Sequence, residues 1–341
     1  MNIRTITIFI LIVVLSVALT QLNGKHQADP SLSVQTFTQT REIMDTSVTI
    51  TIVDEYEEHA SRAMNNAFEQ IDHVGDLMTS YGNSSQLVQL NERGQLDNAD
   101  EELVYVLGQS KYYSNISDGA FDVTIKPVLD LWSSKFAPGG THEPPTPHEI
   151  EETLELVNYT QIFIEGNNIS LGENMDIVLG GIAKGYAVDK AIESLRADGI
   201  ENGFVNAGGD GRYIGSGPEE NPWKVGLQNP DKDGDAVSVM NIQDMAVATS
   251  GNYERYFSET AKVSHISDPR TGYSAQGLIS STIIAESAME ADALATAVFV
   301  LGEKHGLEII EGMDNVECLI ITSDRQVIRS SGYSSYETKE V

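Results

Sequence analysis

The sequence predicts an α/β protein of mixed α+β type, in which strands and helices alternate irregularly within a single large domain. Apolar positions between residues 54 and 78 recur with helical spacing, whereas residues 36–53 alternate and are rich in Thr, Val and Ile, as paired strands are. The 341 residues are enough for one large or two ordinary domains, and no internal repeat divides them.

The other predicted elements follow in irregular order. Further helices are expected over 101–115, after a capping-box signal at 146–149, from the glycines at 180–181 to Gly199, over 290–301 and over 303–311, with Gly302 between the last two. Strands are expected over 161–171, 177–179, 203–210, 223–228, 245–251, 278–286 and 316–329. Loops are expected over 79–85, 117–122, 136–147 and 229–236.

The charge and cysteine content exclude several classes of site. The chain has 21 basic and 51 acidic residues, a net charge of −30, which opposes nonspecific binding to nucleic acid. An anionic ligand therefore needs local help from a cation, a helix end or a metal. Cys318 is the single cysteine, so neither a disulfide within the chain nor a cysteine metal site is possible.

The N-terminus reads as a targeting segment. Arg4 precedes an apolar, uncharged run over 5–19, which is long for a signal peptide and slightly short for a full membrane span. Small residues suited to cleavage are poorly represented at 18–20, so an uncleaved signal anchor is preferred and export with cleavage is the alternative. We therefore divide the chain into a signal segment over 1–22, a polar tether over 23–36 and a domain over 37–341 outside the cytoplasm.

A glycine-rich stretch has the pattern of a ligand-binding turn. The apolar residues 177–179 meet two glycines, and a packed helical face follows at Ala183, Ala187, Ala191 and Leu195. Glycines there allow helix N-terminal N–H groups to approach an anion, and Lys184 adds a positive charge suited to phosphate. The alternative is a turn that only packs strand on helix. Neither a Walker A loop nor a dinucleotide fingerprint is present.

The helix over 290–301 brings one carboxylate and one hydroxyl to the same face. Asp292 and Thr296 are four residues apart in an otherwise small and apolar segment. A buried carboxylate is costly unless it is paired or binds a metal. With backbone carbonyls, waters and ligand phosphates, this donor pair suits Mg²⁺. The alternative is that Asp292 caps the helix and Thr296 only packs.

His265 begins a polar turn over 265–272. Histidine is the side chain most easily poised as a base near neutral pH. The alternative is a histidine that is merely solvated on a loop.

Taken together, these stretches resemble the ApbE family, the FAD:protein FMN transferases. Eight landmarks occur in the family's order from about residue 38 to the end, and their combination is far more specific than any one of them. They are Met44-Asp-Thr, Thr79-Ser-Tyr with Leu90-Asn91, Gly119-Ala-Phe-Asp-Val-Thr, Leu179-Gly-Gly-Ile-Ala-Lys-Gly-Tyr-Ala, Val205-Asn-Ala-Gly-Gly-Asp, Ala248-Thr-Ser-Gly, His265-Ile-Ser-Asp-Pro-Arg-Thr-Gly and Ala291-Asp-Ala-Leu-Ala-Thr.

The resemblance implies an Mg²⁺-dependent enzyme that splits FAD, releases AMP and attaches FMN through its phosphate to a Ser or Thr of an exported redox protein. It implies metal ligation by Asp292, Thr296 and the Gly181 carbonyl, and it places His265 as the base for the acceptor hydroxyl. The positions that match the family's FAD contacts are Met44, Tyr81, Ala120, Phe121, Asp122, Lys184 and Ser267.

Two departures from the family pattern affect these expectations. Val178 stands where the family usually has Asp, and Asp176 would share its strand face about 7 Å away. No lipobox cysteine is present near residue 20, which favours an anchoring helix over a lipid. Two alternative functions remain open, an FAD pyrophosphatase that gives FMN and AMP and a flavin-binding module without turnover.

Overall fold

The computed structural model describes residues 34–80, 84–230, 236–252, 256–258, 263–264 and 266–338. The chain separates into units over 1–35 and 36–341, and the architecture below is that of the second unit. The predicted signal segment lies outside the described residues, as does the tether up to residue 33. In the ranges given above, no helix is both long and apolar enough to cross a bilayer.

Within the described residues the central sheet has eight strands, and neighbours from β2 to β15 pair antiparallel. In spatial order they are β1 (Gln35–Ile43), β2 (Thr46–Asp54), β6 (Gly203–Ala207), β7 (Asp210–Ile214), β10 (Ala246–Gly251), β13 (Leu278–Ala285), β14 (Glu317–Thr322) and β15 (Val327–Arg329). Helices interrupt this order along the chain, so the predicted mixed α and β class is confirmed.

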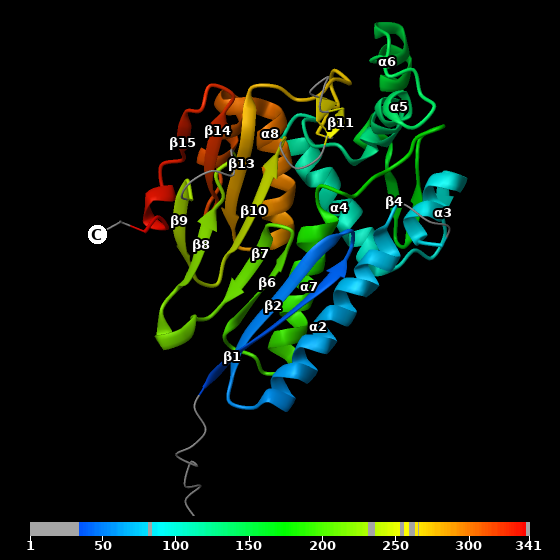
Figure 1. Cartoon of the computed structure of the whole chain (residues 1–341). Coiled ribbons are helices and arrows are strands. Elements are labelled where there is room, and N and C mark those ends of the chain that lie inside the picture. Colours follow the sequence, from blue (N-terminus) through cyan, green and yellow to red (C-terminus); the bar gives the residue numbers. More distant parts are fainter. Residues whose placement is uncertain are drawn as a thin grey trace, which may run out of the picture. The chain divides into compact units, whose positions relative to one another are not determined.

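Both faces of the sheet are covered, because alternate side chains of its strands enter two different hydrophobic clusters. Ile283 and Cys318 point into the main core, whereas Ile284 and Leu319 point to the opposite face. The main core lies beneath the helices α2 (Glu57–Met78), α7 (Ala183–Ala197) and α8 (Ala288–Glu311), as Figure 1 shows. The other face is covered by the hairpin of β8 (Trp223–Leu227) and β9 (Ser238–Ile242).

The first two strands form a hairpin around the predicted turn. Met44 and Asp45 have φ angles of 54° and 56°, both in the left-handed region. A two-residue hairpin loop of type I′ needs this conformation at both positions, because it matches the twist of the flanking strands. The turn thus fixes the backbone position from which the Met44 side chain projects.

Helix α2 has the helical spacing of apolar residues that the sequence predicts. It begins at Glu57 rather than Asp54, because Asp54 still belongs to β2 and accepts a hydrogen bond from the Tyr56 amide. The apolar positions expected to pack are all buried, namely Ala60, Ala63, Met64, Ala67, Phe68, Ile71 and Val74.

Helix α8 contains the predicted break. Gly302 has φ 77° and ψ −177°, which is not helical, so the helix is interrupted between the segments expected over 290–301 and 303–311. Asp292 and Thr296 both lie before the break, in the segment that packs against β10 and β13.

Local structure differs from the expectations in two missed helices and one strand that is absent. The helices α3 (Gln86–Arg93) and α5 (Lys126–Phe136) were not predicted, and residues 177–179 are not a strand. The Asn91 side chain hydrogen-bonds the Ile177 backbone on both its N–H and C=O, at 2.8 and 2.9 Å, and the Val178 amide donates to the Val123 carbonyl at 2.8 Å. These contacts satisfy the backbone of the apolar run without a neighbouring strand.

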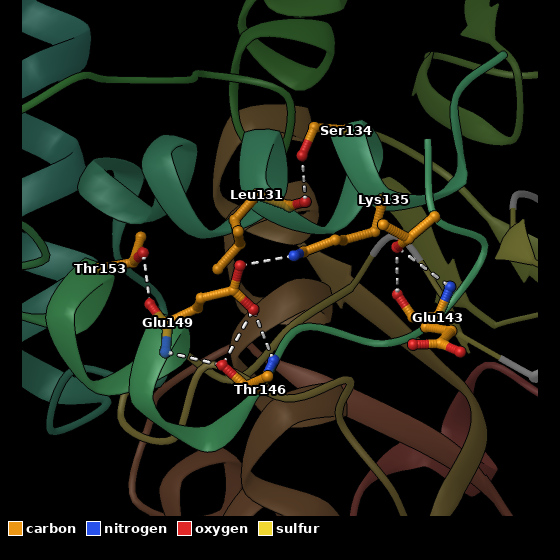
Figure 2. A network of polar contacts seen from close by, with 8 residues as sticks. Leu131, Ser134, Lys135, Glu143, Thr146, Glu149 and Thr153 are labelled. Carbon is orange, nitrogen blue, oxygen red and sulfur yellow. Dashed lines mark hydrogen bonds and ion pairs between the residues drawn. The ribbon is translucent and has the colours of Figure 1, made fainter. Parts of the chain in front are cut away.

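The capping box before α6 (Pro147–Leu154) is confirmed and extended by an ion pair (Figure 2). The Thr146 hydroxyl accepts from the Glu149 amide at 3.3 Å, and the Glu149 carboxylate accepts from the Thr146 amide at 2.8 Å. Lys135 of α5 donates to the same carboxylate at 2.5 Å, which together with the Thr146 contacts lowers the pKa of Glu149 to about 2. The box therefore joins α6 to α5 across the proline-rich loop.

The remaining elements surround this framework. They are α4 (Glu101–Ile116), a small sheet of β3 (Gln95–Leu96), β5 (Asn168–Ser170) and β4 (Phe163–Glu165), and a pair formed by β11 (Tyr256–Ser258) and β12 (Val263–Ser264). The terminal hairpin expected over 316–329 is present as β14 and β15, and Cys318 is buried in it.

Candidate active site

The site forms where the first turn of α7 meets the first turns of α8. A Cβ added to Gly185 would lie 2.2 Å from the Ala288 carbonyl oxygen and 2.7 Å from the Met289 Cα, so only glycine fits there. This close approach places Lys184, the residue before the glycine, beside α8. The glycine pattern noted in the sequence thus serves helix packing as well as the site.

Asp292 is the carboxylate at the centre of the site. Its side chain is 5% exposed, its Oδ2 accepts from the Gly185 amide at 3.0 Å, and the Lys184 Nζ lies 3.7 Å from that oxygen. Burial raises the pKa of Asp292 to about 7, with Lys184 opposing the shift and the nearby Asp210 adding to it. The carboxylate therefore lies in a site that a cation would stabilise.

Lys184 is shared between two carboxylates. Its ammonium forms an ion pair with Asp210, the first residue of β7, which is 2% exposed. The other Asp210 oxygen accepts from the Thr249 amide of β10 at 3.3 Å. Asp210 was missed as a site residue, although it ends one of the quoted family landmarks, directly after a pair of glycines.

Gly181 and Thr296 lie together, as the sequence predicts. A Cβ added to Gly181 would lie 3.1 Å from the Thr296 Oγ1 and 3.3 Å from the Phe121 Cε2. The Ser250 hydroxyl is within 3.2 Å of the Thr296 hydroxyl, a contact that was not predicted. The glycine turn therefore brings its backbone close to the Thr296 hydroxyl.

Helix α8 is capped by residues other than Asp292. The Ser287 hydroxyl accepts from the Glu290 amide at 3.2 Å, and the two Asp189 oxygens accept from the Ala288 and Met289 amides, both at 2.9 Å. Arg212 of β7 donates to Asp189 at 2.8 Å. Burial raises the pKa of Asp189 and Arg212 opposes that shift. Asp292 lies one turn further along, so the helix does not need it as a cap.

Asp122 organises the turn that presents Ala120 and Phe121. One of its oxygens accepts from the Thr124 amide and hydroxyl at 2.8 and 2.7 Å, and the other accepts from the Tyr159 amide at 3.0 Å. Burial raises the pKa of Asp122, and these hydrogen bonds oppose the rise. Ala120 and Phe121 are 1% and 3% exposed, so the turn is rigidly packed.

The other expected FAD contacts are not brought to Asp292 by the described contacts. Met44 packs near Gly75 of α2, where an added Cβ would lie 3.1 Å from the Met44 Cγ. Ser267 is 6% exposed, and its hydroxyl is buried without a hydrogen-bond partner in the described part of the chain. Tyr81 and His265 lie outside the described residues, so the aromatic contact and the base stay predictions.

Val178 and Asp176 have separate environments. Val178 packs against the apolar cluster of α5 and α6 that contains Trp132. Burial raises the pKa of Asp176, and Lys126 opposes that shift. Residues 177–179 are not a strand, so Asp176 and Val178 do not share a strand face.

The donor set at this site fits Mg²⁺. Asp292 supplies a buried carboxylate, Thr296 a hydroxyl and Gly181 a nearby backbone, all hard oxygen donors. Over the described ranges, no group of three or more His, Cys, Asp or Glu side chains could hold a metal.

Comparisons with known proteins show which family the chain resembles in sequence and fold. The family model described as "ApbE family" matches residues 44–320. An FAD:protein FMN transferase of Haemophilus influenzae is 34% identical over 283 residues, covering 78% of this chain and 81% of that protein. One from Vibrio cholerae is 31% identical over 261 residues, covering 74% and 78%. The crystal structure of the ApbE protein of Thermotoga maritima superposes with a TM-score of 0.82 at 31% identity, over 89% of this chain and all of that one.

Proposed function

This chain belongs to the ApbE family, and we propose that it is an Mg²⁺-dependent FAD:protein FMN transferase that modifies a Ser or Thr hydroxyl of an exported redox protein. In this reaction the acceptor oxygen forms a bond to the FMN phosphorus, the bond from that phosphorus to the AMP oxygen breaks, and the hydroxyl proton is lost. The observation that carries the proposal is the meeting of Asp292, Lys184, Thr296 and Gly181 at the first turns of α7 and α8.

The proposed roles follow from the chemistry of these groups. Asp292, Thr296 and the Gly181 carbonyl would hold Mg²⁺, which when bound would neutralise charge that develops on the phosphates. Lys184 offers an ammonium to the pyrophosphate beside the N-terminus of α7, whose N–H groups also favour an anion. The phosphorus would thus be bound and oriented by positive groups of α7 and by the ion that α8 helps to hold.

The remaining FAD and acceptor contacts are proposed from the resemblance. Met44, Tyr81, Ala120 and Phe121 would form the surface for the flavin or adenine ring, and Asp122 would hold the turn that carries two of them. The Ser267 hydroxyl, which is buried and has no hydrogen-bond partner among the described residues, would donate to the substrate. His265 would take the proton from the acceptor hydroxyl.

A reconstitution assay tests the proposed reaction against both alternatives. The protein is incubated with FAD, Mg²⁺ and an acceptor domain, and the products are separated by denaturing gel and chromatography. We expect fluorescent flavin on the acceptor and one AMP for each flavin attached. Free FMN with AMP and no labelled acceptor would instead indicate a pyrophosphatase, and unchanged FAD would indicate a binding module. Omission of Mg²⁺ is the control, and it should abolish labelling.

The domain is proposed to act outside the cytoplasm while held to the membrane by its N-terminal segment. The apolar run over 5–19 and the poor cleavage signal support this location. Cell fractionation followed by N-terminal sequencing should find the protein with membranes and its N-terminus intact. Soluble exported protein that begins after residue 20 would contradict the anchor.

A further inference from the structure

Asp210 is a buried carboxylate next to Lys184, and the proposed reaction gives it no role. Its side chain is 3% exposed, compared with 5% for Asp292 and 32% for Lys184. The Thr249 amide of β10 hydrogen-bonds one of its oxygens, and the Lys184 ammonium pairs with the other. Asp210 is thus fixed from the sheet and faces the lysine.

Lys184 lies between two carboxylates from different elements. Asp210 comes from β7 and Asp292 from α8, and the ammonium forms a close ion pair with Asp210 and a longer one with Asp292, at 3.7 Å. A lysine ammonium is a compact charge on a flexible stem, so its position depends on what holds it. Of the two acids, Asp210 holds it more closely.

A lysine that moved fully onto Asp292 would oppose a cation there. Asp292 is the charged member of the proposed Mg²⁺ donor set, and an ammonium paired with it would have to be displaced before the ion could bind. Held by Asp210, the same ammonium remains near the place where the substrate phosphates would lie. The arrangement separates two positive groups that would otherwise compete for one carboxylate.

We propose that Asp210 is a positioning residue for the transfer reaction proposed above: by pairing more closely with the Lys184 ammonium, it keeps that ammonium from closing fully onto Asp292 and so leaves Asp292 available to a divalent cation. In this role Asp210 would touch neither the cation nor the substrate, because its two oxygens are engaged by Lys184 and the Thr249 amide. Its effect on the site passes through Lys184.

A double-mutant cycle on cation binding tests this inference without reference to turnover. The probe is Mn²⁺, followed by the electron paramagnetic resonance signal of the free ion, with the full chain and no FAD. In the chain that keeps Lys184, Asp210→Asn is expected to weaken Mn²⁺ binding at least about tenfold. In a Lys184→Met background the same substitution should change Mn²⁺ binding less than about threefold, because no ammonium remains to compete.

Equal weakening in both backgrounds would overturn the inference, since it would mean that the Asp210 charge acts directly on the ion. An unchanged affinity in both backgrounds would overturn it as well. Asp244→Asn is the matched control, because it removes the same charge from an exposed position near Arg196 and should leave Mn²⁺ binding unchanged. If Asp210→Asn does not fold, the smaller Asp210→Ser is interpreted by the same criteria.

The transferase assay gives a second readout that a purely structural role would not produce. Asp210→Asn should raise the Mg²⁺ concentration needed for half-maximal labelling at least about tenfold, and saturating Mg²⁺ should restore most of kcat. A kcat that stays low at saturating Mg²⁺ would contradict positioning through Lys184. If the wild-type chain labels no acceptor, the proposed function fails, while the Mn²⁺ cycle still decides the role of Asp210.

Discussion

Replacing Asp292 with Asn is expected to lower kcat/KM for FMN transfer at least about a hundredfold, or roughly 3 kcal/mol at the transition state. The substitution removes the charged member of the Asp292, Thr296 and Gly181 donor set but nearly preserves volume and helix geometry. An amide oxygen can still accept from the Gly185 amide, which Asp292 now does at 3.0 Å. The measurement is labelling of the acceptor at several FAD and Mg²⁺ concentrations.

The same variant should fold at least as stably as the wild type. Burial raises the pKa of Asp292 from its usual range to about 7. At pH values above the pKa of the unfolded state, keeping this carboxylate in the folded protein therefore lowers the free energy of unfolding. Asn removes that cost, and thermal unfolding should show no loss. Thr296→Val serves as the graded comparison, with a smaller loss because one neutral ligand is removed. Normal turnover by Asp292→Asn would mean that Asp292 is structural and the metal lies elsewhere.

Replacing Asp189 with Ala is expected to lower the free energy of unfolding by about 3–5 kcal/mol. Asp189 accepts the first two amides of α8 and the Arg212 guanidinium, and it is 6% exposed. Its loss would leave the largely buried Arg212 without its partner and two helix N–H groups without acceptors. Urea unfolding followed by circular dichroism measures the change, and activity should fall with it because α8 carries Asp292.

Asp244→Asn controls for removal of a carboxylate charge, since the Asp244 side chain is 58% exposed and its pair with Arg196 is loose. An Asn oxygen can still accept from the Gly215 amide, and Asn tolerates the left-handed φ of 53°, so a change within about 0.5 kcal/mol is expected. Adding Arg212→Met to Asp189→Ala should recover part of the loss, because the stranded charge is then gone. A loss below about 1 kcal/mol for Asp189→Ala alone would show that water satisfies this junction.

Secondary structure could be predicted from the sequence where the residue pattern depends on one element alone. Helix α2 has an apolar stripe over its 22 residues, and the break at Gly302 follows from one glycine between two helical patterns. Helix α5 was missed because it directly follows the buried residues 123–125, and no side-chain cap at Ile125 marks where it begins. The run at 177–179 was assigned to a strand because its actual partners, the Asn91 side chain and the Val123 carbonyl, come from distant parts of the chain.

The site residues likewise divide into those that could be predicted from the sequence and those that could not. Asp292 and Thr296 could be paired from their spacing on one helix, and the glycine turn pointed to Gly181 and Lys184. The ion pair of Lys184 with Asp210 and the contact of Thr296 with Ser250 could not be predicted, because 26 and 46 residues separate the partners along the chain. Only the close packing of α7 on α8 and the strand order of the sheet bring these groups together.

The turn between β1 and β2 contains a residue type that is unfavourable for its backbone conformation. Its two-residue turn places Met44 and Asp45 in the left-handed region, where Asn-Gly is the favoured pair and a residue with a long side chain costs about 1–3 kcal/mol. Natural proteins retain such unfavourable choices where function outweighs stability. Met44→Asn should therefore relieve the strain of the turn, at the loss of the Met44 side chain that packs near Gly75. Selection for an unstrained turn would favour Asn at this position, whereas the proposed contact of the Met44 thioether with the flavin would favour methionine.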